Sequence, residues 1–184
     1  MSSKIPSWLQ QAQDAWSFRG QKRPGFAIEP GPGQESVWDY PRPPAMVPDS
    51  RHVIVKAGDL LIADSTATIR ICETASPPAF YIPPQDVKLD SLAAAPGSSF
   101  CEWKGPASYW QLASGGSNEP IGWSYPNPLS GSEAVMGFFS FYPGRVECYV
   151  DGKRVRPQAG GFYGGWITDE IVGPFKGDPG TSGW

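Results

Sequence analysis

The sequence predicts an all-β protein: a compact domain of antiparallel sheets, with an N-terminal helix and irregular Pro/Gly-rich arms. Three observations lead to this fold class. The 184 residues include 22 Gly and 21 Pro, about twice the average usage, which indicates short elements joined by many turns. Several runs alternate apolar and polar residues, as half-buried strands do. Helical periodicity is extended in one place only, close to the N-terminus.

Residues 1–34 are expected to form that helix and an extended arm. Apolar residues recur at helical spacing over residues 5–18, and Pro6 suits the first turn of a helix. The Pro- and Gly-rich stretch that follows, residues 19–50, keeps Trp38, an aromatic side chain that a free tail would seldom carry. We therefore expect this stretch to pack on the domain.

Residues 35–150 are interpreted as the β domain. Residues 53–55 and 60–63 flank a Gly58-Asp59 turn and predict a hairpin. Further strands are expected at residues 68–73, 79–82, 87–89, 99–104, 108–112 and 146–150.

One short helix is predicted late in the domain, because Ser130 and Glu133 fit the S-x-x-E capping box. Residues 151–184 are Gly-rich but rich in aromatic anchors, and we expect a second arm lying over the domain. The arm residues expected to bury apolar surface against the sheets are Trp8, Trp16, Trp38, Phe162, Trp166 and Phe175.

Charge and cysteine usage exclude several partners. Fifteen basic and eighteen acidic residues give a net charge of -3, so the cationic footprint of a nucleic-acid-binding protein is absent. No stretch has the length of a signal peptide or membrane span, which favours a cytoplasmic protein without membrane partners.

Three cysteines without a CxxC pair and a single histidine predict reduced thiols, no metal site and no cofactor. A monomer or small homo-oligomer is expected.

A polar turn is the first candidate for chemistry. The run from Glu73 to Pro78 ends a strand with a carboxylate, two hydroxyl groups and two prolines, so a rigid turn can aim Glu73 and Ser76 into a cleft. Hydrogen bonding of Glu73 to neighbouring loops is the alternative.

The run from Ser99 to Gly105 is the second candidate. Strand alternation would place Cys101 and Trp103 on one face and Glu102 and Lys104 on the other. Lys104 could then reach an anionic ligand, or simply pair with Glu73. Aromatic residues with polar tips could wall a pocket; they are Tyr81, Trp103, Tyr109, Trp123, Tyr125 and Tyr142.

These motifs, in order, resemble the DUF427 family over residues 35–150. The matching segments are Val37-Trp-Asp-Tyr-Pro-Arg-Pro-Pro44, Ala63-Asp64, Arg70 with Glu73-Thr74, Pro77-Pro78, Phe80-Tyr-Ile-Pro83, Cys101 with Trp103-Lys-Gly105, Tyr109, Trp123-Ser-Tyr-Pro126 and Phe141-Tyr142. Phe162-Tyr-Gly-Gly-Trp166 and Gly173-Pro-Phe-Lys-Gly177 are typical of a longer subgroup with both arms.

The resemblance implies a β-tent-like domain, in which two antiparallel sheets meet at an angle. The zinc that many β-tent proteins hold through paired cysteines does not carry over, because those pairs are absent. The nucleotidyltransferase role sometimes attached to the family would imply a D-x-D motif after Gly-Ser, and this sequence has none. Ser76 stands where many members have a histidine, so a general-base role built on that histidine does not carry over to this sequence.

The sequence therefore favours a domain that binds an unidentified small molecule in an aromatic-walled pocket. If the domain is an enzyme, Glu73 would act as acid or base, with Lys104 or Tyr81 holding an oxyanion. A protein- or peptide-interaction module without catalysis is the alternative, and a purely structural role is a third. Arms packed over the sheets would favour a pocket, whereas arms paired with another copy would favour assembly.

Overall fold

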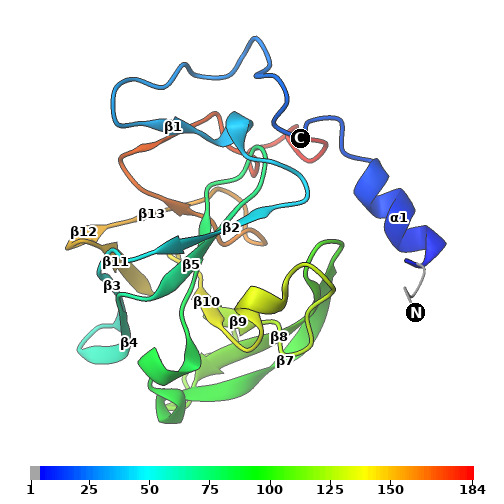
Figure 1. Cartoon of the computed structure of the whole chain (residues 1–184). Coiled ribbons are helices and arrows are strands. Elements are labelled where there is room, and N and C mark those ends of the chain that lie inside the picture. Colours follow the sequence, from blue (N-terminus) through cyan, green and yellow to red (C-terminus); the bar gives the residue numbers. More distant parts are fainter. Residues whose placement is uncertain (1–4) are drawn as a thin grey trace.

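The computed structural model describes residues 5–184, and over these residues the protein is all-β with one α-helix near the N-terminus (Figure 1). The first antiparallel sheet has the strand order β12-β11-β3-β4. Its strands are β3 (Val53–Ala57), β4 (Leu60–Ser65), β11 (Glu147–Val150) and β12 (Lys153–Arg154). The hairpin expected around Gly58 is confirmed, and the alternation expected at residues 146–150 buries Cys148 and Val150.

The second four-stranded sheet is antiparallel, with the order β10-β9-β8-β7. Its strands are β7 (Leu92–Cys101), β8 (Gly105–Leu112), β9 (Gly122–Ser124) and β10 (Phe139–Phe141). A third sheet has the order β2-β5-β6, from β2 (Ala45–Asp49), β5 (Thr68–Cys72) and β6 (Ala79–Tyr81). Ile82 and Phe139 exchange main-chain hydrogen bonds of 2.7 and 2.9 Å, which joins the second and third sheets.

Both arms pack on these sheets. The short strand β1 (Glu35–Ser36) pairs in parallel with β15 (Ile171–Val172), and β13 (Arg156–Pro157) pairs with β14 (Trp166–Ile167). Trp166 is fully buried, stacks on Phe80 at 4.9 Å and donates a hydrogen bond to the main-chain oxygen of Phe141. The domain boundaries at residues 34 and 150 stay a prediction.

Not every arm aromatic is buried as predicted. Trp38 and Trp166 are fully buried, but 53% of Trp8 and 64% of Phe162 are exposed. Trp8 instead contacts Phe100 edge to face at 5.1 Å, on the surface of the β7–β8 hairpin. A hydrophobic side chain on an arm can thus lie over a hairpin tip without entering the core.

The two predicted helices are shorter than expected. The first, α1 (Ser7–Asp14), ends before Trp16, whose indole N–H donates to Glu102 Oε1 at 2.6 Å. The first four residues of the predicted arm lie outside the described residues. The helix expected after Ser130 is a single 3₁₀ turn, Glu133–Val135, because Gly131 and Gly137 adopt left-handed conformations on either side. Three more 3₁₀ turns are Val37–Asp39, Pro84–Asp86 and Leu89–Ser91. The strand expected at residues 87–89 is reduced to an isolated bridge between Val87 and Ala63.

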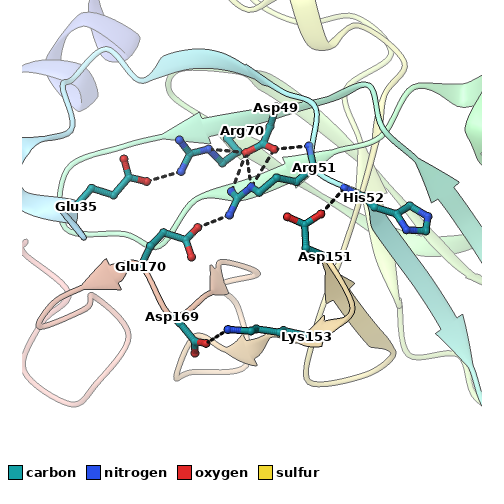
Figure 2. A network of polar contacts seen from close by, with 9 residues as sticks. All are labelled: Glu35, Asp49, Arg51, His52, Arg70, Asp151, Lys153, Asp169 and Glu170. Carbon is teal, nitrogen blue, oxygen red and sulfur yellow. Dashed lines mark hydrogen bonds and ion pairs between the residues drawn. The ribbon is translucent and has the colours of Figure 1, made fainter. Parts of the chain in front are cut away.

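A chain of ion pairs fastens both arms to the third sheet (Figure 2). Arg70 of β5 pairs with Glu35 of β1 and with Asp49 of β2, and Asp49 in turn pairs with Arg51 at 2.7 Å. Arg51 also pairs with Glu170, beside β15. Burial alone would raise the pKa of Asp49, but hydrogen bonds from Arg51 outweigh it and hold that pKa below its usual value. These charges satisfy one another, so this cluster is a structural fastening.

Candidate functional site

A cavity of about 290 Å³ lies between the sheets and the two arms. The sheets provide one side of it, from β5, β6, β8 and β9. The residues they contribute include Ile71, Ala79, Tyr81, Ala107, Tyr109 and Trp123. The arms provide the other side, through Trp16, Phe162, Tyr163, Gly164, Gly165 and Lys176. The cavity is therefore complete only when both arms are packed on the domain.

All the predicted site residues except Trp103 line this cavity. They are Glu73, Ser76, Tyr81, Lys104, Tyr109, Trp123, Tyr125 and Tyr142. Trp103 is buried away from the cavity, and its indole N–H has no hydrogen-bond partner among the described residues.

The alternation predicted along the run from Ser99 to Gly105 is wrong. Strand β7 ends at Cys101, which pairs with Gly105, so the three residues between them form the turn of the β7–β8 hairpin. A turn does not alternate its side chains between two faces. Consequently Cys101, Glu102 and Lys104 all line the cavity, and Trp103 alone points elsewhere.

The turn that carries Glu73 and Ser76 is held from both arms. Ala75, at its centre, donates its N–H to the Val37 oxygen at 3.1 Å and accepts a hydrogen bond from the N–H of Lys176 at 2.8 Å. Ala75 adopts a left-handed conformation with φ of 71°, which an L residue keeps only when its surroundings enforce it. The position of Glu73 therefore depends on the packing of both arms.

Glu73 pairs with Arg42, and the predicted alternative of a Glu73–Lys104 pair is wrong. Arg42 Nε lies 3.0 Å from Glu73 Oε1, and only 5% of Arg42 is exposed. The guanidinium group also donates to the main-chain oxygens of Phe18, Thr74 and Trp184. One buried cation thus joins the Glu73 turn to both arms.

The aromatic wall is cross-linked by hydrogen bonds. The Trp123 indole N–H donates to the Tyr81 hydroxyl oxygen at 2.9 Å, and the Tyr109 hydroxyl donates to Ser99 at 2.7 Å. Burial raises the pKa of Tyr81 to about 12 and also raises that of Tyr125. Both hydroxyl groups are therefore protonated at neutral pH, and the wall is uncharged there.

Two lysine ammonium groups lie against aromatic rings of the cavity, one on the sheet side and one on the arm side. Lys104 Nζ lies 5.8 Å from the centre of the Tyr125 ring, and Lys176 Nζ lies 3.7 Å from the centre of the Trp16 ring. Among the described residues, neither ammonium group has a carboxylate within 4.0 Å. Within residues 5–184, the cavity thus holds two lysine cations without ion-pair partners.

The pKa values of these two lysines move in opposite directions. Burial and, to a smaller extent, the charge of Arg42 together lower the pKa of Lys176 to about 8, against the opposing effect of Glu73 and Glu102. Burial also acts to lower the pKa of Lys104, but the net pKa is raised: the ionised forms of Cys101, Tyr81 and Tyr125 contribute most, at high pH, and the Glu73 carboxylate contributes less. Lys104 is the permanent cation of the cavity.

Local sequence explains how the C-terminal arm places Lys176. Gly177 has φ of 128°, and a Cβ there would lie 2.1 Å from the main-chain oxygen of Ala159, so only glycine fits after this lysine. At Gly164 a Cβ would lie 2.2 Å from the Trp123 ring. Gly164 lets the arm lie directly against the cavity wall, and Gly177 lets two segments of the arm pack closely on each other.

Sequence reasoning did not predict the roles of Trp16, Arg42 and Lys176. Arg42 stands inside the segment 37–44 and Lys176 inside the segment 173–177, both of which stand out in the sequence only as family motifs. A lysine followed by an obligatory glycine in an aromatic-rich arm was the available signal for Lys176. Nothing in the sequence indicated that Arg42 rather than Lys104 is the partner of Glu73.

No group of three potential metal-binding side chains occurs in residues 5–184. In the same residues no helix is long and apolar enough to cross a membrane. His52, the single histidine, is exposed and hydrogen-bonds Asp64 at 2.7 Å, away from the cavity.

The fold and the cavity define the molecule as an all-β protein with one aromatic-walled cavity closed by two arms. Residues 45–152 match the family model described as a domain of unknown function, DUF427. This match covers more than half of the chain, so the protein belongs to that family. No curated protein matches the chain significantly. The matched segment contains the sheet side of the cavity, whereas Trp16, Arg42 and Lys176 lie outside it.

Proposed function

We propose that the protein binds a small anionic molecule with a flat apolar body in this cavity. The observation that carries the proposal is a pair of lysines in one aromatic-lined cavity, Lys104 and Lys176, which have no carboxylate within 4.0 Å among the described residues. A cavity of about 290 Å³ suits a ligand of metabolite size.

The energetics favour an anion over a neutral ligand. Removing an ammonium group from water without a counterion costs several kcal/mol, and a bound carboxylate or phosphate would offset that cost. The two acidic groups in the wall do not supply it: one oxygen of Glu73 binds Arg42, and one oxygen of Glu102 accepts the Trp16 N–H. Aromatic rings around the cavity would hold the apolar body of the ligand by stacking.

Cys101 provides a test that works whatever the natural ligand is. Its thiol lies in the cavity wall, whereas Cys72 and Cys148 are buried and have pKa values raised by burial, that of Cys72 to about 11. We expect iodoacetamide to modify Cys101 well ahead of the other two thiols in the native protein.

Benzoate should slow this modification. Benzamide, its neutral counterpart, should need a concentration about ten-fold higher to give the same protection. Lys104→Met should abolish the protection by benzoate. Equal protection by benzoate and benzamide, or no protection by either, would overturn the proposal of an anion site. Peptide mapping by mass spectrometry identifies the modified cysteine.

One observation favours the alternative of a peptide-binding module. Phe100 and Phe162 both line the cavity and are both well exposed, so an apolar segment could lie across them. In that case Phe162→Ser would abolish capture of peptides from a random display library, while benzoate would leave Cys101 unprotected.

A further inference from the structure

Lys176 lies in surroundings that suit a reactive amine. Only 5% of the residue is exposed, and its Nζ lies over the Trp16 ring at 3.7 Å and near the Tyr163 ring at 5.5 Å. The charged groups that act on it are Arg42, Glu73 and Glu102, and among the described residues none of the carboxylates is within ion-pair distance. An amine in such a site loses its proton more readily than one in water.

Hydrogen bonds hold the backbone that carries this amine. The Lys176 N–H donates to Ala75, and the Lys176 main-chain oxygen accepts a hydrogen bond from the Gln158 side chain. Ala75 belongs to the same turn as Glu73 and Ser76, so the amine and these polar groups are positioned together. This is the arrangement expected of a nucleophile with polar groups beside it.

Lys104 and Lys176 divide two tasks between them. The raised pKa of Lys104 keeps it cationic, whereas the pKa of Lys176 near 8 leaves a share of that amine neutral at physiological pH. A cation recognises a carboxylate, and a neutral amine attacks a carbonyl carbon. A ligand that carries both groups would engage both lysines.

We propose that Lys176 forms a reversible imine with the aldehyde or ketone group of a small carboxylic acid whose carboxylate lies at Lys104. This inference rests on the function proposed above and names the class of ligand, an oxo acid with a flat apolar body. It gives the lysine of the C-terminal arm a covalent role that the sheet side of the cavity cannot supply.

The step balances without any further reactant. The Lys176 nitrogen lone pair forms a bond to the carbonyl carbon while the C=O π pair moves to oxygen. Transfer of a proton from nitrogen to that oxygen gives a neutral carbinolamine. Loss of the hydroxyl group with a second proton then releases one water and leaves the C=N bond, and addition of water reverses the sequence.

The test uses 4-formylbenzoate as the probe and sodium cyanoborohydride to reduce any imine to a stable secondary amine. We expect one adduct in the intact protein, mapped to Lys176, at a rate at least about ten-fold above that of the exposed Lys88 near neutral pH. The rate should reach half its plateau near pH 8, the pKa of Lys176. Lys176→Arg should remove the adduct, whereas Lys88→Arg should leave it unchanged.

Protection of Cys101 separates the two proposals. If 4-formylbenzoate protects Cys101 but Lys176 is labelled no faster than Lys88, the imine is overturned and the anion site stands. If neither protection nor selective labelling occurs, both are overturned. Because the labelled residue is mapped in the unaltered protein, the result does not depend on whether a variant folds.

Discussion

Replacing Lys176 with methionine should make the protein more stable at neutral pH. Methionine keeps the length and flexibility of the lysine stem and removes the buried charge. Only 5% of Lys176 is exposed, and among the described residues no carboxylate lies within 4.0 Å of its ammonium group. The native fold therefore keeps a cation at a cost, as binding sites often do.

The magnitude follows from the pKa. A decrease from 10.5 to about 8 corresponds to about 3 kcal/mol of destabilisation when the amine is charged. Methionine carries no such cost, so Lys176→Met should gain about 3 kcal/mol at pH 7.

The pH dependence has a defined sign. The folded-state pKa of Lys176 is below its unfolded value, so between about 8 and 10.5 the unfolded chain binds more protons than the folded one. The stability of the wild-type protein therefore rises with pH through this window relative to the variant. The advantage of Lys176→Met should be complete below pH 8 and should vanish by about pH 10.5.

Urea unfolding followed by tryptophan fluorescence at a series of pH values measures this difference. Lys88→Met, at an exposed position, serves as the control and should change the free energy of unfolding by less than about 0.5 kcal/mol. The expected cost of the buried ammonium group is disproved if Lys176→Met is less stable than the wild type at pH 7, or if the difference does not change between pH 7 and 10.

Two further substitutions test how the arms build the cavity. Gly164→Ala should destabilise the fold by about 1–3 kcal/mol, because the new Cβ would meet the Trp123 ring at 2.2 Å. Gly161→Ala is the control and should be nearly neutral, because among the described residues a Cβ there meets nothing within 4 Å. Equal midpoints of the two variants in thermal unfolding would contradict this expectation. Arg42→Met should cost about 3 kcal/mol or more, because it leaves Glu73 and three main-chain oxygens without their partner. A urea midpoint close to that of the wild type would show that Arg42 does not join the arms.

Local patterns predicted the sheets well because a strand pair needs little more than alternation and a turn. The hairpin around Gly58 and the buried positions Cys148 and Val150 are examples. Where glycines interrupt a pattern, the prediction fails: Gly131 and Gly137 reduce the expected helix to one 3₁₀ turn. Backbone conformation there outweighs the capping box.

The candidate site was predictable only from the domain side. Glu73, Ser76 and the aromatic residues were identified from rigid turns and polar tips, and all of them except Trp103 lie around one cavity. Arg42, which holds Glu73, and Lys176, which lines the cavity, lie 31 and 103 residues away from Glu73, counting from 42 to 73 and from 73 to 176. Such contacts depend on how the arms fold back, which no local pattern reports.

Binding of a small anion between Lys104 and Lys176 is the property on which both proposals depend. A crystal structure of the protein soaked with 4-formylbenzoate tests it directly. We expect density for the compound in the cavity, with its carboxylate beside Lys104 Nζ and its carbonyl carbon joined to Lys176 Nζ. A cavity that holds only water at a saturating concentration of the compound would contradict anion binding at this site.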